Sequence, residues 1–136
     1  MESLALPLSA LSSYPSSASV PYRADASDRD DIDHMLDMTY MQEARKRASA
    51  VRQLCLCHLK MNDRDVWDRL LAMVTDDDAT VRGHVVHVLA DGSLRRRLTE
   101  VVTALETLWH DPDLKIRRRV RRVLATYQRT GNVNSL

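Results

Sequence analysis

From residue 30 onward, apolar side chains recur every three to four positions, the spacing of an α-helix that buries one face. Five such stripes follow one another: Ile32, Met35, Leu36 and Tyr40; Val66, Leu70, Leu71 and Val74; Val81, Val85, Val88 and Leu89; Leu94, Leu98, Val101, Val102, Leu105 and Trp109; Ile116, Val120, Val123, Leu124 and Tyr127. Asp63 (or Asn62) and Ser93 are candidate N-caps, and Gly92 and Gly131 are candidate C-terminal stops. No segment alternates with the period of two that marks a strand. The pattern predicts an all-α chain.

The last two pairs of predicted helices are copies of each other at a constant offset of 35 residues. The segment Asp-Asp-Asp-Ala-Thr-Val-Arg at 76–82 aligns with Asp-Pro-Asp-Leu-Lys-Ile-Arg at 111–117, and the apolar positions that follow also match. Aspartates before a helix accept hydrogen bonds from its free amides, and their charge suits the positive end of the helix dipole. Pro112 loses no hydrogen bond, because a first-turn amide has no partner within its helix. Each copy therefore predicts a helix, an acidic turn and a second helix.

This arrangement resembles the HEAT repeat, a helix–turn–helix unit of about this period that stacks into a solenoid. The resemblance covers residues 30–130 and rests on the Val-Arg or Ile-Arg after the turn and on the later Leu-Ala. It implies a short right-handed α-solenoid of about three units. The first unit has Arg47 in frame but Met41 where the later turns have aspartate, as degenerate terminal units often do.

In the HEAT family, an aspartate in the turn and an arginine six positions later typically bond to their counterparts in neighbouring repeats. The resemblance therefore implies inter-repeat roles for Asp76, Arg82, Asp111 and Arg117. We expect replacement of Arg82 or Arg117 by alanine to destabilise the fold, because each would lose a hydrogen-bonded charge partner. Replacement of Arg121, expected to be exposed, should have little effect.

Composition separates the start of the chain from the rest. Residues 1–31 hold eight serines and three of the four prolines. A segment of this composition buries too little apolar surface to offset the entropy lost when the segment becomes ordered. We predict a flexible tail over residues 1–29 and a HEAT-like repeat domain over residues 30–136. The apolar run at 4–8 lacks the preceding positive charge of a signal peptide, and no run approaches the roughly 20 residues that cross a bilayer. Two closely spaced cysteines form no disulfide framework, so the expected location is cytoplasmic, without a membrane partner.

Charge is divided unevenly behind the net value of +1. Residues 1–44 hold two arginines and eight acids, whereas residues 45–136 hold 18 basic and 11 acidic residues. On the last predicted helix, the spacing i, i+3, i+4, i+11 places four basic side chains on one stripe: Arg118, Arg121, Arg122 and Arg129. The stripe has three interpretations: a solvated face, a contact with an acidic protein surface (including this chain's own acidic front), or a contact with nucleic-acid phosphate.

Two clusters could suggest metal chemistry. Cys55, Cys57 and His58 form a Cys-x-Cys-His motif, but no further cysteine completes a thiolate set, so core thiols are the favoured interpretation. His84 and His87 have i, i+3 spacing, but no carboxylate sits near them in the predicted helix. We expect exposed or partner-contacting histidines. Glycine-rich phosphate loops and nucleophile elbows are missing from the sequence, so neither catalysis, a metal nor a cofactor is predicted.

These observations favour a non-catalytic scaffold or regulatory module that binds an acidic protein partner through the repeat surface. The second helices of the units, over about residues 45–60, 79–90 and 114–129, would line its groove. The alternative is binding of a nucleic-acid phosphate backbone by the arginine-rich last helix. A third class, HEAT-like enzymes that attach bilin chromophores, is not supported by any reactive group in the sequence.

Overall fold

The computed structural model describes residues 26–54, 63–92 and 95–133 of the 136-residue chain. These residues form six α-helices and two short 3-10 helices, and none of them lies in a strand. The elements are α2 (Ala26–Met38), α3 (Ala44–Gln53), α5 (Arg64–Ala72), η3 (Met73–Thr75), α6 (Ala79–Gly92), η4 (Arg95–Arg97), α7 (Leu98–Glu106) and α8 (Leu114–Thr130). The all-α prediction is confirmed. Among the helices described, none combines the length and apolar character that a membrane span requires.

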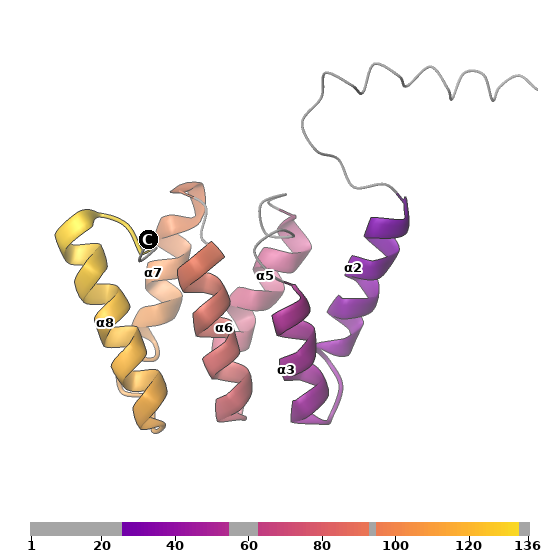
Figure 1. The fold of residues 1–136 in the computed structure, drawn as a ribbon, viewed down its shortest axis with the longest axis horizontal. Coiled ribbons are helices and arrows are strands. Elements are labelled where there is room, and N and C mark those ends of the chain that lie inside the picture. The colour runs from indigo at the N-terminus through magenta and orange to yellow at the C-terminus, as the bar shows by residue number, and fades with distance from the viewer. Residues whose placement is uncertain (1–25, 55–62, 93–94, 134–136) are drawn as a thin grey trace, which may run out of the picture.

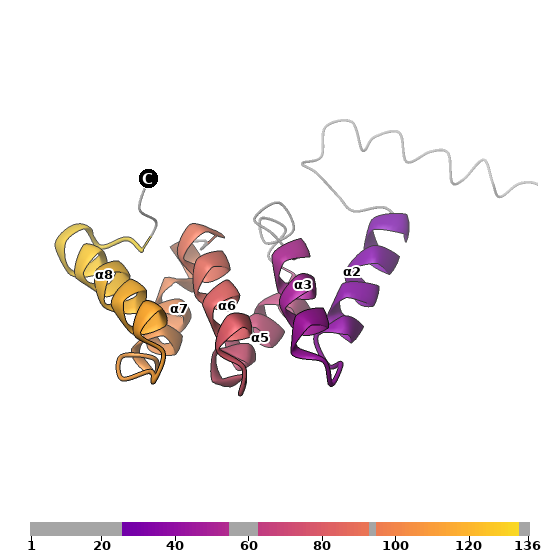
Figure 2. The same ribbon diagram turned by 60° about the horizontal axis from the view of Figure 1, so that its bottom comes forward.

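The helices pair into three consecutive hairpins, α2–α3, α5–α6 and α7–α8 (Figure 1). The second helices α3, α6 and α8 lie side by side in one layer, with α5 and α7 behind them, and α2 lies at the N-terminal end of the stack (Figures 1 and 2). The helices α3 and α6 contact each other, as do α6 and α8, whereas α5 contacts α7 in the other layer. The arrangement is a short α-solenoid of three units.

Aspartate side chains start three of these helices. The carboxylate of Asp63 accepts hydrogen bonds from the amides of residues 65 and 66, and Asp113 accepts them from residues 115 and 116. Asp78 accepts one from the amide of Val81 at 3.1 Å. Gly131 ends α8 in the left-handed conformation with a φ of 75°, which glycine adopts without steric cost. The acidic turns therefore act first as helix caps.

One continuous apolar core runs through all three hairpins. It contains the inward positions of every predicted stripe, and its largest fully buried side chain is Trp67 of α5. Two aromatic residues assigned to the stripes are exceptions, because Tyr40 and Trp109 are 70% and 40% exposed. Both lie in turns after a helix has ended, so the prediction that they continue the buried stripes is wrong.

Two helix boundaries differ from the sequence prediction. The helix α2 begins at Ala26, inside the segment predicted as tail, whereas residues 1–25 lie outside the described residues. The predicted helix ending at Trp109 stops at Glu106, because the amides of residues 107–109 bond to carbonyls three positions back instead of four. Its predicted cap, Ser93, also lies outside the described residues, and Arg95–Arg97 form a separate 3-10 turn.

Candidate functional site

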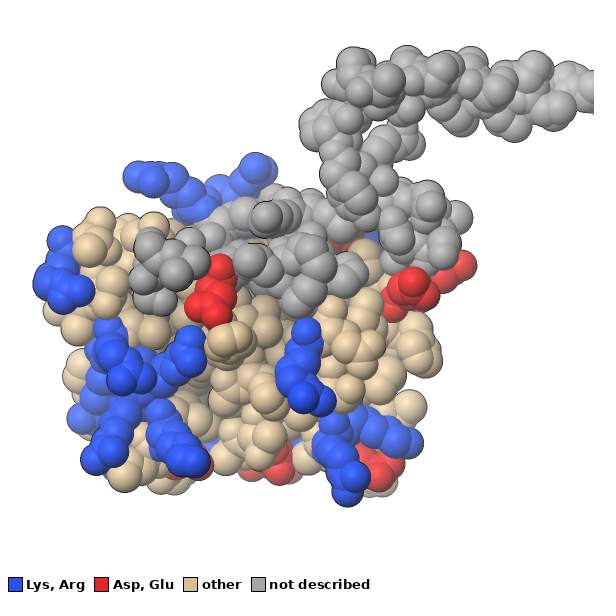
Figure 3. Space-filling view, in the orientation of Figure 1, with Lys and Arg blue, Asp and Glu red and all other residues tan. Residues whose placement is uncertain are grey.

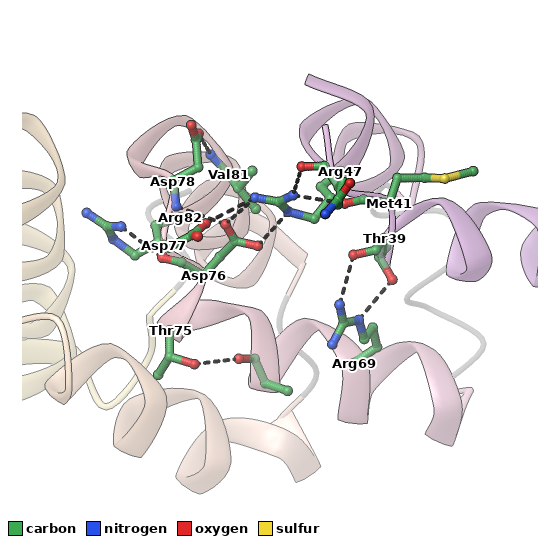
Figure 4. A network of polar contacts seen from close by, with 12 residues as sticks. Thr39, Met41, Arg47, Arg69, Thr75, Asp76, Asp77, Asp78, Val81 and Arg82 are labelled. Carbon is green, nitrogen blue, oxygen red and sulfur yellow. Dashed lines mark hydrogen bonds and ion pairs between the residues drawn. The ribbon is translucent and has the colours of Figure 1, made fainter. Parts of the chain in front are cut away.

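A ladder of arginine–aspartate pairs joins the hairpins through the turns that precede their second helices. From α3, Arg47 points its guanidinium at Asp76 in the next hairpin, with Nε 2.9 Å from Oδ2 and Nη2 3.0 Å from Oδ1 (Figure 4). Its remaining nitrogen, Nη1, donates to the carbonyls of Met41 and Gln42 in its own turn at 2.8 and 2.7 Å. A single side chain therefore connects two hairpins.

The second rung repeats this geometry one hairpin later. Arg82 of α6 donates to the carboxylate of Asp111 through Nε at 2.8 Å and Nη2 at 3.1 Å. Its Nη1 donates to the carbonyl of Asp76 in its own turn at 2.8 Å. The side chains of Arg82 and Asp111 are only 11% and 3% exposed. Paired, parallel hydrogen bonds of this kind are among the strongest that a side chain makes.

The ladder shifts the ionisation of its members. Burial raises the pKa of Asp76, but hydrogen bonds from Arg47 and from the amide of Asp78 outweigh it and hold that pKa below its ordinary value. Hydrogen bonding to Asp76 and to Asp111 raises the pKa values of Arg47 and Arg82 respectively, against an opposing effect of burial. The rung formed by Arg47 and Asp76 is therefore an ion pair at neutral pH.

Arg117 of α8 holds the position in the repeat that Arg82 holds in α6, but it makes only one of the two kinds of contact that Arg82 makes. Its Nη1 donates to the carbonyl of Asp111 at 2.7 Å, as Arg82 does in its own turn. Within the described ranges, no carboxylate receives the other side of its guanidinium. The degenerate first unit, in contrast, contributes a complete rung through Arg47 although Met41 replaces the aspartate.

A second joint connects the first two hairpins beside the first rung, since Thr39, Arg69, Arg47 and Asp76 line one hollow. Arg69 of α5 donates to the hydroxyl and the carbonyl of Thr39 at 2.9 and 2.8 Å (Figure 4). Its guanidinium also lies 3.7 Å from the centre of the Tyr40 ring. At the opposite end of α2, Arg29 pairs with Asp63 and Asp65 at the start of α5. Sequence reasoning missed both contacts, since no repeat frame or helical stripe relates these residues.

The four arginines assigned to one stripe of α8 divide into two groups. Arg118, Arg122 and Arg129 are exposed, and no acidic side chain of the described residues pairs with them. Arg121 instead contacts Trp109 in the turn between α7 and α8. Its Nε donates to the carbonyl of Trp109 at 3.0 Å, and its guanidinium lies 4.7 Å from the centre of the Trp109 ring. The exposed stripe therefore has three arginines, and Arg121 belongs to the C-terminal end of the stack.

Charge separates strongly between the first and second helices of the hairpins. The second helices α3, α6 and α8 hold 12 arginines and lysines and one acid, Asp91. The first helices α2, α5 and α7 hold three arginines and nine acids. In the view of Figure 3, lysine and arginine side chains gather over α8, whereas acidic ones lie over the end formed by α2. The net charge of +1 hides basic second helices and an acidic N-terminal end, because five of the nine acids lie on α2.

The two histidines lie on α6 in different surroundings. His84 is half-buried, and its pKa is lowered by burial and by the nearby charges of Arg52 and His87. His87 is exposed, with Nε2 3.1 Å from Asp91. The expectation that no carboxylate lies near them is wrong, because α6 extends to Gly92 and brings Asp91 one turn from His87.

No group of three metal-ligating side chains occurs within residues 26–54, 63–92 and 95–133. The remaining candidate cluster, Cys55, Cys57 and His58, lies outside the described residues.

Three stacked helical hairpins joined through their turns define an α-solenoid built from tandem repeats. The family model described as HEAT repeats matches residues 32–125, so the chain belongs to the HEAT-repeat family. This confirms the resemblance drawn from the repeated turn sequences. A search of curated proteins and a search of solved structures found no match.

Proposed function

We propose that the chain is a non-catalytic interaction module that binds an acidic surface of a protein partner through its second-helix layer. HEAT repeats commonly serve as protein-interaction scaffolds, and stacked helices present an extended surface suited to such contacts. The observation that carries the proposal is the separation of charge between the first and second helices, with 12 basic residues and one acid on the second helices.

The exposed stripe of α8 is the centre of this surface. Like charges three and four residues apart on a helix repel by a few tenths of a kcal/mol per pair, and Arg118 and Arg122 have this spacing. A solvated helix avoids that cost by alternating its charges, whereas an anionic partner turns the same arginines into charge-assisted, bidentate donors. Arg45 and Arg52 of α3 extend the basic surface beyond α8, since both are exposed.

The test compares two charge reversals of equal size in the full-length chain. Arg118→Glu with Arg122→Glu alters the proposed surface, whereas Arg95→Glu with Arg96→Glu alters exposed arginines outside the second-helix layer. Each tagged variant is used to capture partners from nuclease-treated extract of the source cell, with quantification by mass spectrometry. We expect the first variant to lose proteins that the wild type and the control both retain. Equal capture by all three would overturn the proposal.

Binding of a generic DNA or RNA duplex is the competing outcome. A surface that neutralises phosphates releases counterions, so its affinity falls steeply and linearly with the logarithm of salt concentration. Duplex binding with that slope, abolished by Arg118→Glu with Arg122→Glu and retained by the control, would replace the protein partner with a nucleic acid.

A further inference from the structure

The four large apolar side chains that are exposed in the described residues all lie in or beside the turns of the first and third hairpins. Tyr40 and Met41, 70% and 43% exposed, lie in the turn of the first hairpin. Trp109 and Leu114, 40% and 47% exposed, lie in or beside the turn of the third hairpin. Both turns are at the same edge of the solenoid, the lower edge in Figure 1. The turn between α5 and α6 exposes no such residue.

The third hairpin exposes a surface whose equivalent in the second hairpin is buried against the next hairpin. At the offset of 35 residues, Trp109 corresponds to Val74 and Val102 to Trp67, which are 4% and 0% exposed. At the end of the stack the same surface forms a hollow, lined by Val102, Glu106, Trp109, Leu124, Tyr127 and Gln128. Arg121 lies beside this hollow, with its guanidinium 4.7 Å from the centre of the Trp109 ring, and Glu106 is the one charged residue of the lining. On the same helix, Arg117 lacks the carboxylate that Arg47 and Arg82 meet.

The N-terminal end carries the opposite charge. Along α2, the spacing i, i+3, i+7 places Asp30, Asp33 and Asp37 on the face opposite the buried Ile32 and Met35. All three aspartates are exposed, and His34 is the other titratable side chain on this face. Asp33 is paired with Arg29 at 2.9 Å, whereas no hydrogen bond or ion pair of the described residues engages the carboxylates of Asp30 and Asp37.

We propose that the chain associates head to tail with a second copy of itself, the basic end at α8 binding the acidic end at α2. Each terminal hairpin exposes an apolar pair in or beside its turn. The helices at the two ends have opposite charge, with seven basic residues on α8 and five acids with one arginine on α2. A second copy is the occupant because this one chain carries both complementary halves. The contact is heterologous, so every added copy leaves one free end of each kind and the assembly grows with concentration. This surface is distinct from the stripe of Arg118, Arg122 and Arg129 that the proposed function uses.

The test measures the weight-average mass of the full-length chain by sedimentation velocity across a concentration series. Leu114→Glu with Arg121→Glu blocks the basic end, and Asp37→Lys with Met41→Lys blocks the acidic end. The control variant, Arg95→Glu with Arg96→Glu, changes exposed charges outside both turns. Circular dichroism and thermal unfolding of every variant show that each retains the fold of the wild type.

Head-to-tail association predicts that wild type and control grow in mass with concentration and shrink in about 1 M salt, where the Debye length is about 3 Å. Each blocked variant alone is monomeric. An equimolar mixture of the two gives dimers and nothing larger, because one variant keeps only its acidic end and the other only its basic end. A monomeric wild type, a blocked variant that still associates alone, or a mixture that stays monomeric would each overturn the proposal.

Discussion

The two arginines Arg82 and Arg117 hold the same position in consecutive hairpins, yet the structure predicts different costs for removing them. Arg82 donates two hydrogen bonds to the carboxylate of Asp111 and one to the carbonyl of Asp76. Replacing it with methionine keeps most of the apolar stem but leaves a carboxylate that is 3% exposed without its cation. Removing one member of a buried ion pair costs about 3–5 kcal/mol.

Arg117 makes one hydrogen bond, to the carbonyl of Asp111, and has no carboxylate partner in the described residues. Its replacement by methionine should therefore cost about 0.5–1.5 kcal/mol, the value of one intramolecular hydrogen bond. This changes the expectation from sequence, which gave Arg82 and Arg117 the same importance. Arg82→Lys keeps the charge without the paired geometry and should fall between the wild type and Arg82→Met.

Urea unfolding of the full-length chain, followed by helical circular dichroism, measures these differences. At a denaturant dependence of about 1–3 kcal/mol/M, a loss of about 3–5 kcal/mol lowers the midpoint of Arg82→Met by about 1–5 M, several times the change for Arg117→Met. Equal midpoint shifts for the two methionine variants would refute the ladder as the origin of the asymmetry. As an internal control, each variant should unfold cooperatively with an unchanged dependence of the free energy of unfolding on urea concentration, which shows that unfolding exposes the same amount of surface.

Three further predictions follow from single positions. Gly131→Ala should destabilise the chain by about 1 kcal/mol, because the residue holds a φ of 75°. Gly83→Ala should stabilise the chain by about 0.5–1 kcal/mol, since an added Cβ meets Ile116 at an ordinary 3.9 Å. Thermal unfolding of both variants checks the opposite signs. Asp76 has a folded pKa below its ordinary value of 3.8, so its contribution to stability is complete above that pH and is lost as pH falls through the folded pKa; Asp76→Asn should flatten the acid loss of stability below about pH 4 in unfolding measured against pH. His84 has a folded pKa below its ordinary value of 6.5, so stability falls as pH decreases below that value. His84→Gln should flatten this decline in unfolding measured against pH, and an unchanged pH profile of this variant would contradict the burial of His84.

Much of the fold could be predicted because hydrophobic spacing and capping chemistry are local. The stripe of Ile116, Val120 and Val123 is buried as its spacing requires, and Asp113 caps the helix that carries it. The 35-residue offset identified the units since each repeats the same turn and the same inward positions. Helix ends were harder to predict: Trp109 fits the period of α7 but follows a tightened last turn that no apolar pattern encodes.

The contacts between hairpins could be predicted only in part. The sequence indicated that Arg82 and Arg117 hold inter-repeat positions. Whether a carboxylate pairs with each arginine depends on which hairpin packs against it, which the local sequence does not determine. Thr39 and Arg69 are 30 residues apart and meet through a backbone carbonyl, which carries no residue signature. The charge separation also needed the fold, because the sequence alternates acidic and basic segments and only the stacking brings the basic second helices side by side.

Site-specific photocrosslinking on the second-helix layer tests the proposed function most directly. Ala125 is exposed on α8, among Arg118, Arg122 and Arg129, and Ala72 is an exposed alanine on α5 in the other layer. A photoreactive amino acid at each position, in the full-length chain within its source cell, reports what touches each layer. The account predicts an adduct at position 125 that protease digests and nuclease leaves intact, lost when Arg118 and Arg122 are changed to Glu, and no matching adduct at position 72. No adduct at position 125, or one that nuclease removes, would contradict an acidic protein partner on this layer.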